Sequence, residues 1–393
     1  MAIDKYQNDK SYQCIDLDSI VVSVTGQCNI YCSYCQNRPA MERFKTNIIP
    51  DRLLFKIFSE LAESFSAKRI TITYTGGEPL LAGKEFYSEV LKAQTKYFPK
   101  DTEILNIIQT NGTLIDASWA AFFKENSIFV SLSIDGPEDI QNIHRPYMNG
   151  KGTFIDVMRA IELLRTNGNH YGLICVVSEI SAIHAARIVE FLLSLEPDII
   201  AFLPCVQFGP VLKPATFGDF NMLAFDAWID PRINPKSIPI RTFRDIWLKV
   251  AGIPTETECG FVGRCPSHPN IDVEGNVRIC DQFLGVHEGI LGNINEHSLI
   301  EIFNNEKTTD ILRYSNDIPS ECRRCRYLSL CGGGCVFSRV SNNGMEYFCI
   351  GRKRMFEHII ETYSRMLGVD WNPISIKITN GGETDGHSKK VGN

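Results

Sequence analysis

Between residues 20 and 205 the chain alternates short apolar runs with amphipathic segments, and this alternation leaves few folds open. The apolar runs are rich in β-branched residues and apolar on both faces, which is typical of buried parallel strands. The segments between them carry apolar side chains three and four residues apart, which predicts helices with one buried face. Six such units in succession predict an α/β fold whose parallel sheet curves into a full or partial barrel.

The expected elements can be read from the sequence. Strands are expected at Ile20–Thr25, Ile70–Tyr74, Ile104–Ile108, Ile128–Ile134, Gly172–Val177 and Ile199–Leu203. Helices are expected at Asp51–Phe65, Lys84–Tyr97, Ala117–Glu125, Phe154–Thr166 and Ile183–Leu195. Residues 206–255 carry few regular signals, and their prolines indicate turns or a linker. Residues 351–368 are expected to form a closing helix, and the polar, glycine-rich residues 380–393 a disordered tail.

Polar or glycine-rich residues follow each of the first four expected strands. Cys28 comes after the first strand, and Thr75–Pro79 after the second. Gln109–Gly112 and Ser133–Gly136 come after the third and fourth. Because the carboxyl ends of parallel strands meet at one edge of the sheet, where such folds place their chemistry, we expect these four groups to build one site.

Composition excludes several classes of function. Lys and Arg total 40 and Asp and Glu total 46, so no excess of positive charge is available for a nucleic-acid backbone. No apolar stretch approaches the roughly 18–20 residues that cross a bilayer, and the polar N-terminus is not a signal peptide. We therefore expect a soluble, cytoplasmic protein. In a reducing cytosol its 14 cysteines are expected to bind metal rather than to form disulfides.

Three cysteines lie together near the N-terminus. Cys28, Cys32 and Cys35 have the spacing C-x3-C-x2-C in a loop directly after a strand, so three thiolates can converge there. No fourth Cys or His lies nearby to close a tetrahedral zinc site, whereas iron–sulfur clusters are commonly held by closely spaced thiolates. Three protein ligands on a four-iron cluster leave one iron open to a substrate or cofactor. The alternative is a zinc site that a distant residue completes.

Eight more cysteines lie between residues 259 and 349, and Cys14, Cys175 and Cys205 stand apart as expected core residues. Eight thiolates suffice for two fully ligated four-iron clusters, and two four-cysteine zinc sites are the competing interpretation. Residues 256–350 show little helical periodicity, so we expect metal to stabilise them. A turn at Glu274-Gly275-Asn276 predicts a small hairpin that leads into Cys280.

The first cysteine group resembles the signature of the radical S-adenosylmethionine (SAM) superfamily, with the aromatic Tyr34 before the third cysteine. The element Gly76-Gly77-Glu78-Pro79 agrees with it. The resemblance covers roughly residues 20–205 and implies a partial (β/α)6 TIM-like barrel with a 4Fe–4S cluster whose open iron binds SAM. One electron then cleaves SAM to methionine and a 5′-deoxyadenosyl radical, which abstracts hydrogen from the substrate.

The resemblance also implies which residues bind SAM. Gly76, Gly77 and Glu78 are expected around its methionine amino group, and Ser133 and Asp135 near its carboxylate or ribose. The full expected set is Tyr34, Gly76, Gly77, Glu78, Pro79, Asn111, Ser133 and Asp135.

The second cysteine group resembles the SPASM extension of radical enzymes that mature peptides and proteins, among them the anaerobic sulfatase-maturing enzymes. The resemblance implies two auxiliary 4Fe–4S clusters, and so three clusters in all. The first auxiliary cluster takes Cys259, Cys265, Cys280 and Cys335, and the second takes Cys322, Cys325, Cys331 and Cys349. With every iron held by protein, their expected role is to carry an electron away from the substrate radical.

Two further residues are candidates for catalysis. Asp281 matches an aspartate proposed in sulfatase-maturing enzymes as the base that takes a substrate proton, and the alternative is a solvated or capping residue after the hairpin. Arg145, in a segment that also resembles that group, is a candidate for binding a carboxylate, or else is a solvated side chain. The chain departs from that group at Gln36-Asn37, where those enzymes carry Phe-Tyr, which puts formylglycine formation in doubt.

These features predict the organisation and function of the chain. The expected parts are an N-terminal extension (1–19), the radical SAM core (20–240), a linker and SPASM domain (241–350), a C-terminal helix and strand (351–379) and a tail (380–393). We expect a two-electron oxidation, by dehydrogenation or cross-linking, of a residue in a peptide or protein, with a flavodoxin- or ferredoxin-type electron donor. The alternatives are the same chemistry on a small molecule such as an amino sugar, or a zinc-stabilised binding module.

Overall fold

Six parallel strands form the centre of the computed structural model. It describes residues 17–39, 48–64, 68–206, 209, 211–255, 259–263, 265–266, 268–284, 289–369 and 371. The strands are β1 (Ser19–Thr25), β2 (Arg69–Gly76), β3 (Glu103–Thr110), β4 (Phe129–Ser133), β5 (Tyr171–Val177) and β6 (Ile199–Pro204). Each strand pairs in parallel with the next along the chain. All six expected strands are confirmed, with ends that shift by at most two residues.

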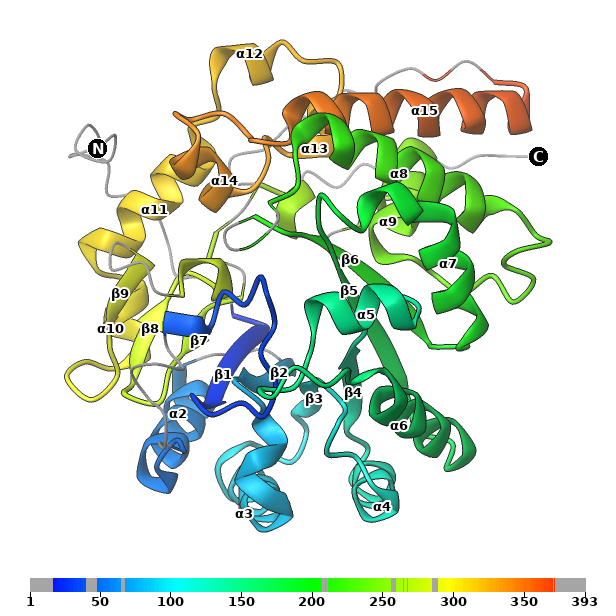
Figure 1. The fold of residues 1–393 in the computed structure, drawn as a ribbon. Helices are drawn as coiled ribbons and strands as arrows, with labels where there is room; N and C mark the ends of the chain where they lie inside the picture. The colour runs from blue at the N-terminus through cyan, green and yellow to red at the C-terminus, as the bar shows by residue number, and fades with distance from the viewer. Residues whose placement is uncertain are drawn as a thin grey trace, which may run out of the picture.

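The helices between these strands cover the outside of the curved sheet, as Figure 1 shows. They are α2 (Asp51–Ser64), α3 (Gly83–Tyr97), α4 (Ala117–Glu125), α6 (Phe154–Thr166) and α7 (Ala185–Ser194), with a short α5 (Glu138–His144) after β4. The apolar side chains of α2 that the spacing singled out are all buried, and they are Leu53, Leu54, Ile57, Phe58 and Leu61. The expected α/β fold is therefore confirmed.

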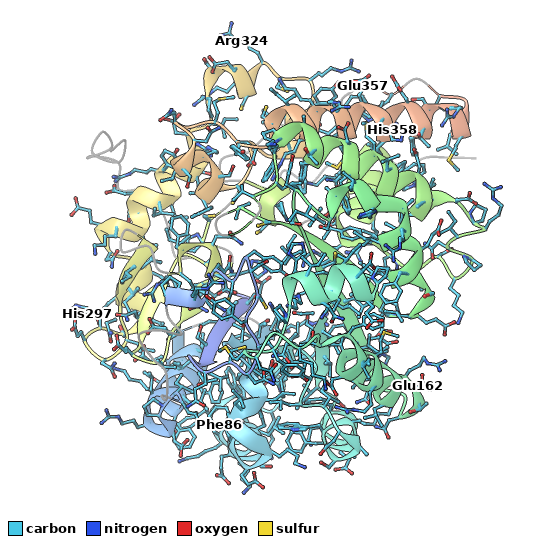
Figure 2. The ribbon with its side chains drawn as sticks, viewed as in Figure 1. Phe86, Glu162, His297, Arg324, Glu357 and His358 are labelled. Carbon is cyan, nitrogen blue, oxygen red and sulfur yellow. The ribbon has the colours of Figure 1, made fainter. Side chains whose placement is uncertain are left out.

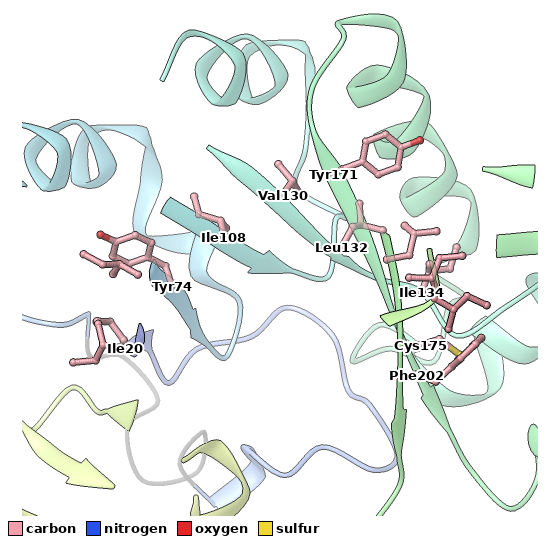
Figure 3. Packing of buried hydrophobic residues seen from close by; sticks show 14 of the residues in the cluster. Ile20, Tyr74, Ile108, Val130, Leu132, Ile134, Tyr171, Cys175 and Phe202 are labelled. Carbon is pink, nitrogen blue, oxygen red and sulfur yellow. The ribbon is translucent and has the colours of Figure 1, made fainter. Parts of the chain in front are cut away.

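The hydrophobic core lies between the strands and the helices that cover them. Figure 3 shows Val130, Leu132 and Ile134 of the β4 region, alternate residues that share one face, and all three are buried. The other face of β2, β3 and β4 is only half-buried, so the expectation of strands buried on both faces holds fully for β1 alone among the first four. Cys175 and Cys205 are also buried, as expected of core residues, while Cys14 lies outside the described residues.

Three short strands extend the same sheet beyond β1. They are β7 (Asn270–Ile271), β8 (Asn276–Arg278) and β9 (Ile290–Asn293), and the sheet runs β6-β5-β4-β3-β2-β1-β7-β8-β9. β7 pairs in parallel with β1, and β7 and β8 form the expected hairpin. β6 and β9 stand at opposite ends of this order, so the six parallel strands form a partial barrel among the described residues.

Residues 206–255 are not the turns or linker that their prolines indicated. They contain α8 (Pro214–Ile229) and α9 (Arg241–Val250). Pro214 occupies the first turn of α8, where proline fits a helix, so it begins the helix instead of breaking it. α8 packs along the final helix α15 (Cys349–Leu367), and Figure 1 shows the two side by side. Because α8 is buried on several sides, it lacks the single apolar stripe that predicts a helix.

The cysteine-rich part also contains more helix than expected. It holds α10 (Leu299–Phe303), α11 (Glu306–Asn316), α12 (Ser320–Arg323), α13 (Leu328–Cys331) and α14 (Val336–Ser341). α11 was missed because it buries only Thr308, Ile311 and Ser315, which leaves almost no apolar pattern. The closing helix is confirmed as α15, beginning two residues before its expected start.

Several expectations cannot be compared with the structure. The expected C-terminal strand and the tail at 380–393 lie outside the described residues, as do residues 1–16 of the N-terminal extension. Across the described part of the chain, no helix combines the length and apolar character that crossing a bilayer requires.

Candidate functional site

The loop that follows β1 carries Cys28, Cys32 and Cys35, and backbone hydrogen bonds hold it in place. Tyr31 N donates to Pro146 O at 2.8 Å, and Ser33 N donates to His144 O at 2.9 Å. These bonds attach the cysteine loop to the segment after α5. The loop is therefore fixed at the carboxyl end of the sheet by another strand-end segment, as the sequence predicted.

The three thiols of this loop are in a condition that suits metal binding. Burial raises the pKa of Cys28 and of Cys32 to about 12, and raises that of Cys35. The negative charge of Glu78 raises the pKa of Cys28 further, and so do those of the Cys32 and Cys35 thiolates. Bound iron removes this penalty because a metal ligand is a thiolate whose charge the metal compensates.

The spacing of the thiols bears on which metal centre fits. Among the described residues no group of three His, Cys, Asp or Glu side chains converges tightly enough to hold a single metal ion. Four sulfurs around one zinc ion lie within about 4 Å of each other because each Zn–S bond is about 2.3 Å. In a 4Fe–4S cluster each thiolate binds a different iron, so the sulfurs stand farther apart. The donors in the loop after β1 are three thiols, and thiolates are the ligands of 4Fe–4S clusters.

The glycine-rich loop after β2 packs directly on the backbone of the cysteine loop. Gly77 N donates to Thr25 O at 2.7 Å, and Glu78 N donates to Gln27 O at 2.6 Å. A Cβ atom on Gly77 would lie 1.9 Å from Gln27 O, and one on Gly76 would lie 2.4 Å from Thr25 O. Gly76 also has a φ of 124°, which favours glycine. Both glycines are thus required by this close approach.

The Glu78 side chain connects this loop to the end of β3. Its Oε1 accepts hydrogen bonds from Thr110 Oγ1 at 2.7 Å and Leu80 N at 3.0 Å, and its Oε2 accepts one from Asn111 N at 2.8 Å. Burial raises the pKa of Glu78 to about 7, and these hydrogen bonds oppose the shift. Pro79 begins the short 3-10 helix η1 (Pro79–Ala82) directly after it.

Asn111 brings the third strand end to the cysteine loop. Its Nδ2 lies 3.9 Å from Cys28 Sγ and donates to Asn29 Oδ1 at 2.9 Å. The structure therefore brings the ends of β1, β2 and β3 together around Cys28, as the strand-end argument predicted.

Asp135, after β4, is the centre of a buried charged group. Its Oδ2 lies 3.1 Å from Arg145 Nε and accepts a hydrogen bond from Tyr34 OH. Its Oδ1 accepts a hydrogen bond from Val176 N at 3.0 Å. Ser133 is buried at the end of β4, two residues earlier. Asp135 is thus held by three different segments at the mouth of the barrel.

Arg145 is buried, with 6% of its surface exposed, so it is not a solvated side chain. Its guanidinium carbon lies 5.4 Å from the centre of the Tyr34 ring. Burial raises the pKa of Cys32, and the positive charge of Arg145 is the strongest influence that lowers it. In the structure the carboxylate that Arg145 contacts is Asp135 of its own chain.

His144 was not among the predicted site residues, yet it connects two strand ends. Its Nδ1 lies 3.0 Å from Ser33 Oγ, and its Nε2 lies 3.0 Å from Ser178 Oγ, just after β5. Burial lowers the pKa of His144, which favours the neutral ring. The sequence could have indicated His144 as a site residue because it directly precedes Arg145, which was predicted.

Cysteines of the second group lie near one another in two places. Cys259, Cys265, Cys280 and Cys335 line one cavity of about 150 Å³. After burial, the neighbouring thiolates Cys335 and Cys259 are the main cause that raises the pKa of Cys265. In the same way, after burial, Cys331, Cys349 and Cys325 raise the pKa of Cys322.

Asp281 lines the same cavity as the first of these sets. Its Oδ1 is buried and has no hydrogen-bond partner. Burial raises the pKa of Asp281 to about 6, opposed by a hydrogen bond from Asn270. Asn270 in turn donates to Ser23 Oγ on β1 at 3.0 Å. Asp281 is therefore held by Asn270, which is itself hydrogen-bonded to β1 of the barrel. Oδ1 of Asp281 is buried and not in contact with solvent.

The second set lies toward one end of the molecule. Figure 2 labels Arg324, which lies between Cys322 and Cys325, at the end opposite Phe86 of α3. The side chain of Arg324 is exposed, and so is that of the neighbouring Arg323, which pairs with Asp317 at 2.7 Å. The segment that carries Cys322 and Cys325 therefore lies at the protein surface.

Two buried arginines near the auxiliary sets were not predicted. Arg339 donates to the backbone oxygens of Tyr314, Ser315 and Asp317, at the end of α11. Arg352 donates to Gly260 O at 2.6 Å, and its Nη1 lies 3.9 Å from Cys331 Sγ. The signal available in the sequence is their spacing, since each follows a cysteine, Cys335 or Cys349, by about one helical turn.

Comparison with known proteins identifies both parts of the chain. A sequence model of the radical SAM superfamily matches residues 22–192, and a model of the SPASM iron–sulfur cluster-binding domain matches residues 259–326. The chain is 30% identical over 368 residues to the cysteine-type anaerobic sulfatase-maturating enzyme of Clostridium perfringens (strain 13 / Type A), covering 90% of this chain and 98% of that one. It is 29% identical over 375 residues to the serine-type enzyme of Bacteroides thetaiotaomicron, covering 86% and 88%.

Solved structures agree with these matches. Native anSMEcpe with bound AdoMet has a TM-score of 0.81 and 29% identity, covering 89% of this chain and 99% of that one. Streptococcus suis SuiB bound to its precursor peptide SuiA, with a TM-score of 0.62 and 16% identity, covers 84% and 74% and shares the fold. The cofactors that follow are SAM and 4Fe–4S clusters. The chain belongs to the radical SAM superfamily with a C-terminal SPASM domain, in the group of the anaerobic sulfatase-maturating enzymes and peptide maturases.

Proposed function

We propose that Cys28, Cys32 and Cys35 hold the cluster that binds SAM, and that the eight later cysteines hold two auxiliary clusters in the sets described above. The support is that Cys28, Cys32 and Cys35 share one loop, and that Cys259, Cys265, Cys280 and Cys335 line one cavity. When bound at the first site, the cluster and SAM supply a 5′-deoxyadenosyl radical that abstracts hydrogen.

The residues around Cys28 would form the SAM pocket. The backbone of Gly76 and Gly77 lies against the cysteine loop and is the part of this element available to the methionine amino group. The Glu78 carboxylate already accepts three hydrogen bonds, so its part is to position that backbone. Asn111, Ser133, Asp135 and Tyr34 complete the proposed pocket.

The proposed substrate is a cysteine or serine residue within a peptide or protein. The relatives named above are cysteine-type and serine-type sulfatase-maturating enzymes, and anSMEcpe has been solved with the Cp18Cys peptide bound. Gln36-Asn37 stands after Cys35, where the resemblance led us to expect an aromatic pair, and the Cp18Cys peptide is the probe for this site. A flavodoxin- or ferredoxin-type protein is the proposed electron donor.

One observation carries the proposed two-electron oxidation. Asp281 places a buried oxygen without a hydrogen-bond partner in the cavity lined by the first auxiliary set. In the proposed step the radical takes a hydrogen atom from the target carbon, Asp281 takes a proton, and one electron passes to the auxiliary site. The substrate has then lost two hydrogen atoms, and 5′-deoxyadenosine carries one of them.

Replacing Asp281 by Asn tests this assignment. The anaerobically reconstituted variant is expected to form 5′-deoxyadenosine, but to yield oxidised Cp18Cys peptide at least about 100-fold more slowly, since a positioned base contributes about 10²–10⁴ in rate. Mass spectrometry of the peptide and chromatography of the nucleoside give both quantities. Asp226→Asn, at an exposed pair with His358, is the control and is expected to match the wild type. Oxidation of the peptide by Asp281→Asn at the wild-type rate would contradict the proposal.

A further inference from the structure

A buried ion pair lies between the two auxiliary sets of cysteines. Glu346 Oε2 and Arg352 Nη2 are 3.6 Å apart, and their side chains are 3% and 8% exposed. Burying two charges is costly unless each has further partners. The partners of this pair are the ligand-bearing loops of both auxiliary sites.

The positive end of the pair faces the second set. Arg352 Nη1 lies 3.9 Å from Cys331 Sγ, within reach of an N–H···S hydrogen bond. The same nitrogen donates to Gly260 O at 2.6 Å, directly after Cys259, which fixes the guanidinium between the two sites. Arg352 also lies over the ring of Phe261, at 4.3 Å from its centre, so the side chain has little freedom to move.

The negative end of the pair faces the first set. Glu346 Oε2 accepts a hydrogen bond from Cys335 N at 2.8 Å. Its Oε1 accepts hydrogen bonds from Ser338 Oγ at 2.9 Å and from Phe348 N at 3.2 Å. The carboxylate is therefore fixed beside a proposed ligand of the first auxiliary cluster, and it occupies the backbone N–H of that ligand.

We propose that the Glu346–Arg352 pair makes the second auxiliary site a more favourable place for an added electron than the first. A positive charge and an N–H···S bond stabilise a reduced cluster, and a negative charge destabilises one, most strongly in a buried, low-dielectric setting. The inference rests on the ligand sets proposed above. The electron comes from the substrate radical, leaves the first site as the second site gains it, and passes to a one-electron carrier of the flavodoxin or ferredoxin class. Arg352 and Glu346 are positioning residues, since each acts through the cysteine loops that it contacts.

The test measures the two auxiliary midpoint potentials directly. The full chain with Cys28→Ala, Cys32→Ala and Cys35→Ala, reconstituted anaerobically, leaves only the auxiliary clusters to titrate by electron paramagnetic resonance. Cys259→Ser and Cys322→Ser assign each signal to its set. In this background Arg352→Gln is expected to lower the potential of the second site by about 59 mV or more, which is tenfold in the one-electron equilibrium. Glu346→Gln is expected to raise the potential of the first site.

Two further variants separate charge from simple damage. Arg354→Gln removes a partly exposed arginine on the same helix, paired with Asp219, and is expected to leave both potentials unchanged. Arg352→Lys keeps the charge and is expected to stay closer to the wild type than Arg352→Gln. If Arg352→Gln loses iron, the Glu346→Gln variant provides the test. A midpoint potential of the first auxiliary site that is unchanged or lowered in Glu346→Gln overturns the proposal. Equal shifts of both sites in Arg352→Gln would also overturn it. A failure of the ligand sets shows separately, as an iron content other than that of two clusters in the triple-alanine background.

Discussion

Single buried polar side chains fix the geometry of the barrel site. Glu78 joins the loop after β2 to the end of β3, His144 joins the cysteine loop to the end of β5, and Asp135 joins the end of β4 to Tyr34. Each is buried and hydrogen-bonded, which is how a buried polar group avoids a desolvation cost. These residues give the cysteine loop one defined position against the strand ends.

Replacing Glu78 by Gln tests the importance of such a connection. The Glu78 carboxylate accepts three hydrogen bonds, and both of its oxygens are used. A glutamine has one oxygen and one NH2 group there, and the NH2 group cannot accept the hydrogen bond of the donor that it faces. We expect a loss of about 1–3 kcal/mol in the free energy of unfolding, the cost of a buried group left without a partner. Anaerobic thermal unfolding of the full chain measures it.

The matched control is Glu89→Gln on α3, where an exposed glutamate pairs with Lys92. Its effect is expected to stay within about 0.5 kcal/mol, as for most surface substitutions. Equal unfolding midpoints for the two variants would mean that Glu78 does not hold these loops together.

The residue types of the site could be predicted from the sequence, but their partners could not. The cysteines and the Gly76–Pro79 element stand out because their spacing is local. The pairing of Arg145 with Asp135, or of Arg352 with Glu346, joins residues on different elements, and a single sequence gives no signal for such a contact. Asp281 was singled out by a resemblance, and only the structure gives its burial.

At the scale of elements, two loops pack backbone to backbone at the carboxyl end of the sheet. The glycines after β2 allow the loop after β1 to approach at hydrogen-bond distance. A glycine in such a position is needed because of the close approach itself. The position of the cysteine loop therefore depends on these glycines.

Gly77→Ala is expected to remove the first cluster selectively. The added methyl group would lie 1.9 Å from Gln27 O, beside Cys28, and backbone must move to relieve the clash. We expect iron content to fall by about one third, with the auxiliary clusters retained, and 5′-deoxyadenosine formation to be lost. Iron analysis and nucleoside chromatography measure the two effects. Gly150→Ala is the control, since a Cβ there meets no atom within 4 Å, although φ is 83°. Full iron content in Gly77→Ala would contradict the packing argument.

The elements of the barrel were predictable and those outside it were largely not, for a physical reason. Short runs rich in β-branched residues and helices with one buried face give clear patterns in the sequence. α8 is surrounded by other elements, and α11 buries few apolar residues, so neither shows a single apolar stripe. The hairpin of β7 and β8 was recognisable because a turn sequence marks it.

At the scale of the whole molecule, the two groups of cysteines share one sheet but occupy different parts of it. β7 of the cysteine-rich part pairs with β1, which leads into Cys28. The cavity of the first auxiliary set also includes Val21 of β1. The barrel site follows β1 and the first auxiliary site contacts β1, so one strand connects the two sites.

This arrangement implies that the two groups of cysteines have separable tasks. The first group is proposed to generate the radical, and the later sets are proposed to accept the electron that the substrate gives up. Loss of the later sets should then leave SAM cleavage possible, while loss of the first group should abolish it.

Cleavage of SAM by cysteine variants tests this central claim most directly. Wild type, Cys32→Ala, Cys325→Ala and the core variant Cys205→Ala are reconstituted anaerobically, reduced and given SAM with the Cp18Cys peptide. The account expects no 5′-deoxyadenosine from Cys32→Ala, measurable 5′-deoxyadenosine without oxidised peptide from Cys325→Ala, and both products from Cys205→Ala. Formation of 5′-deoxyadenosine by Cys32→Ala would contradict it.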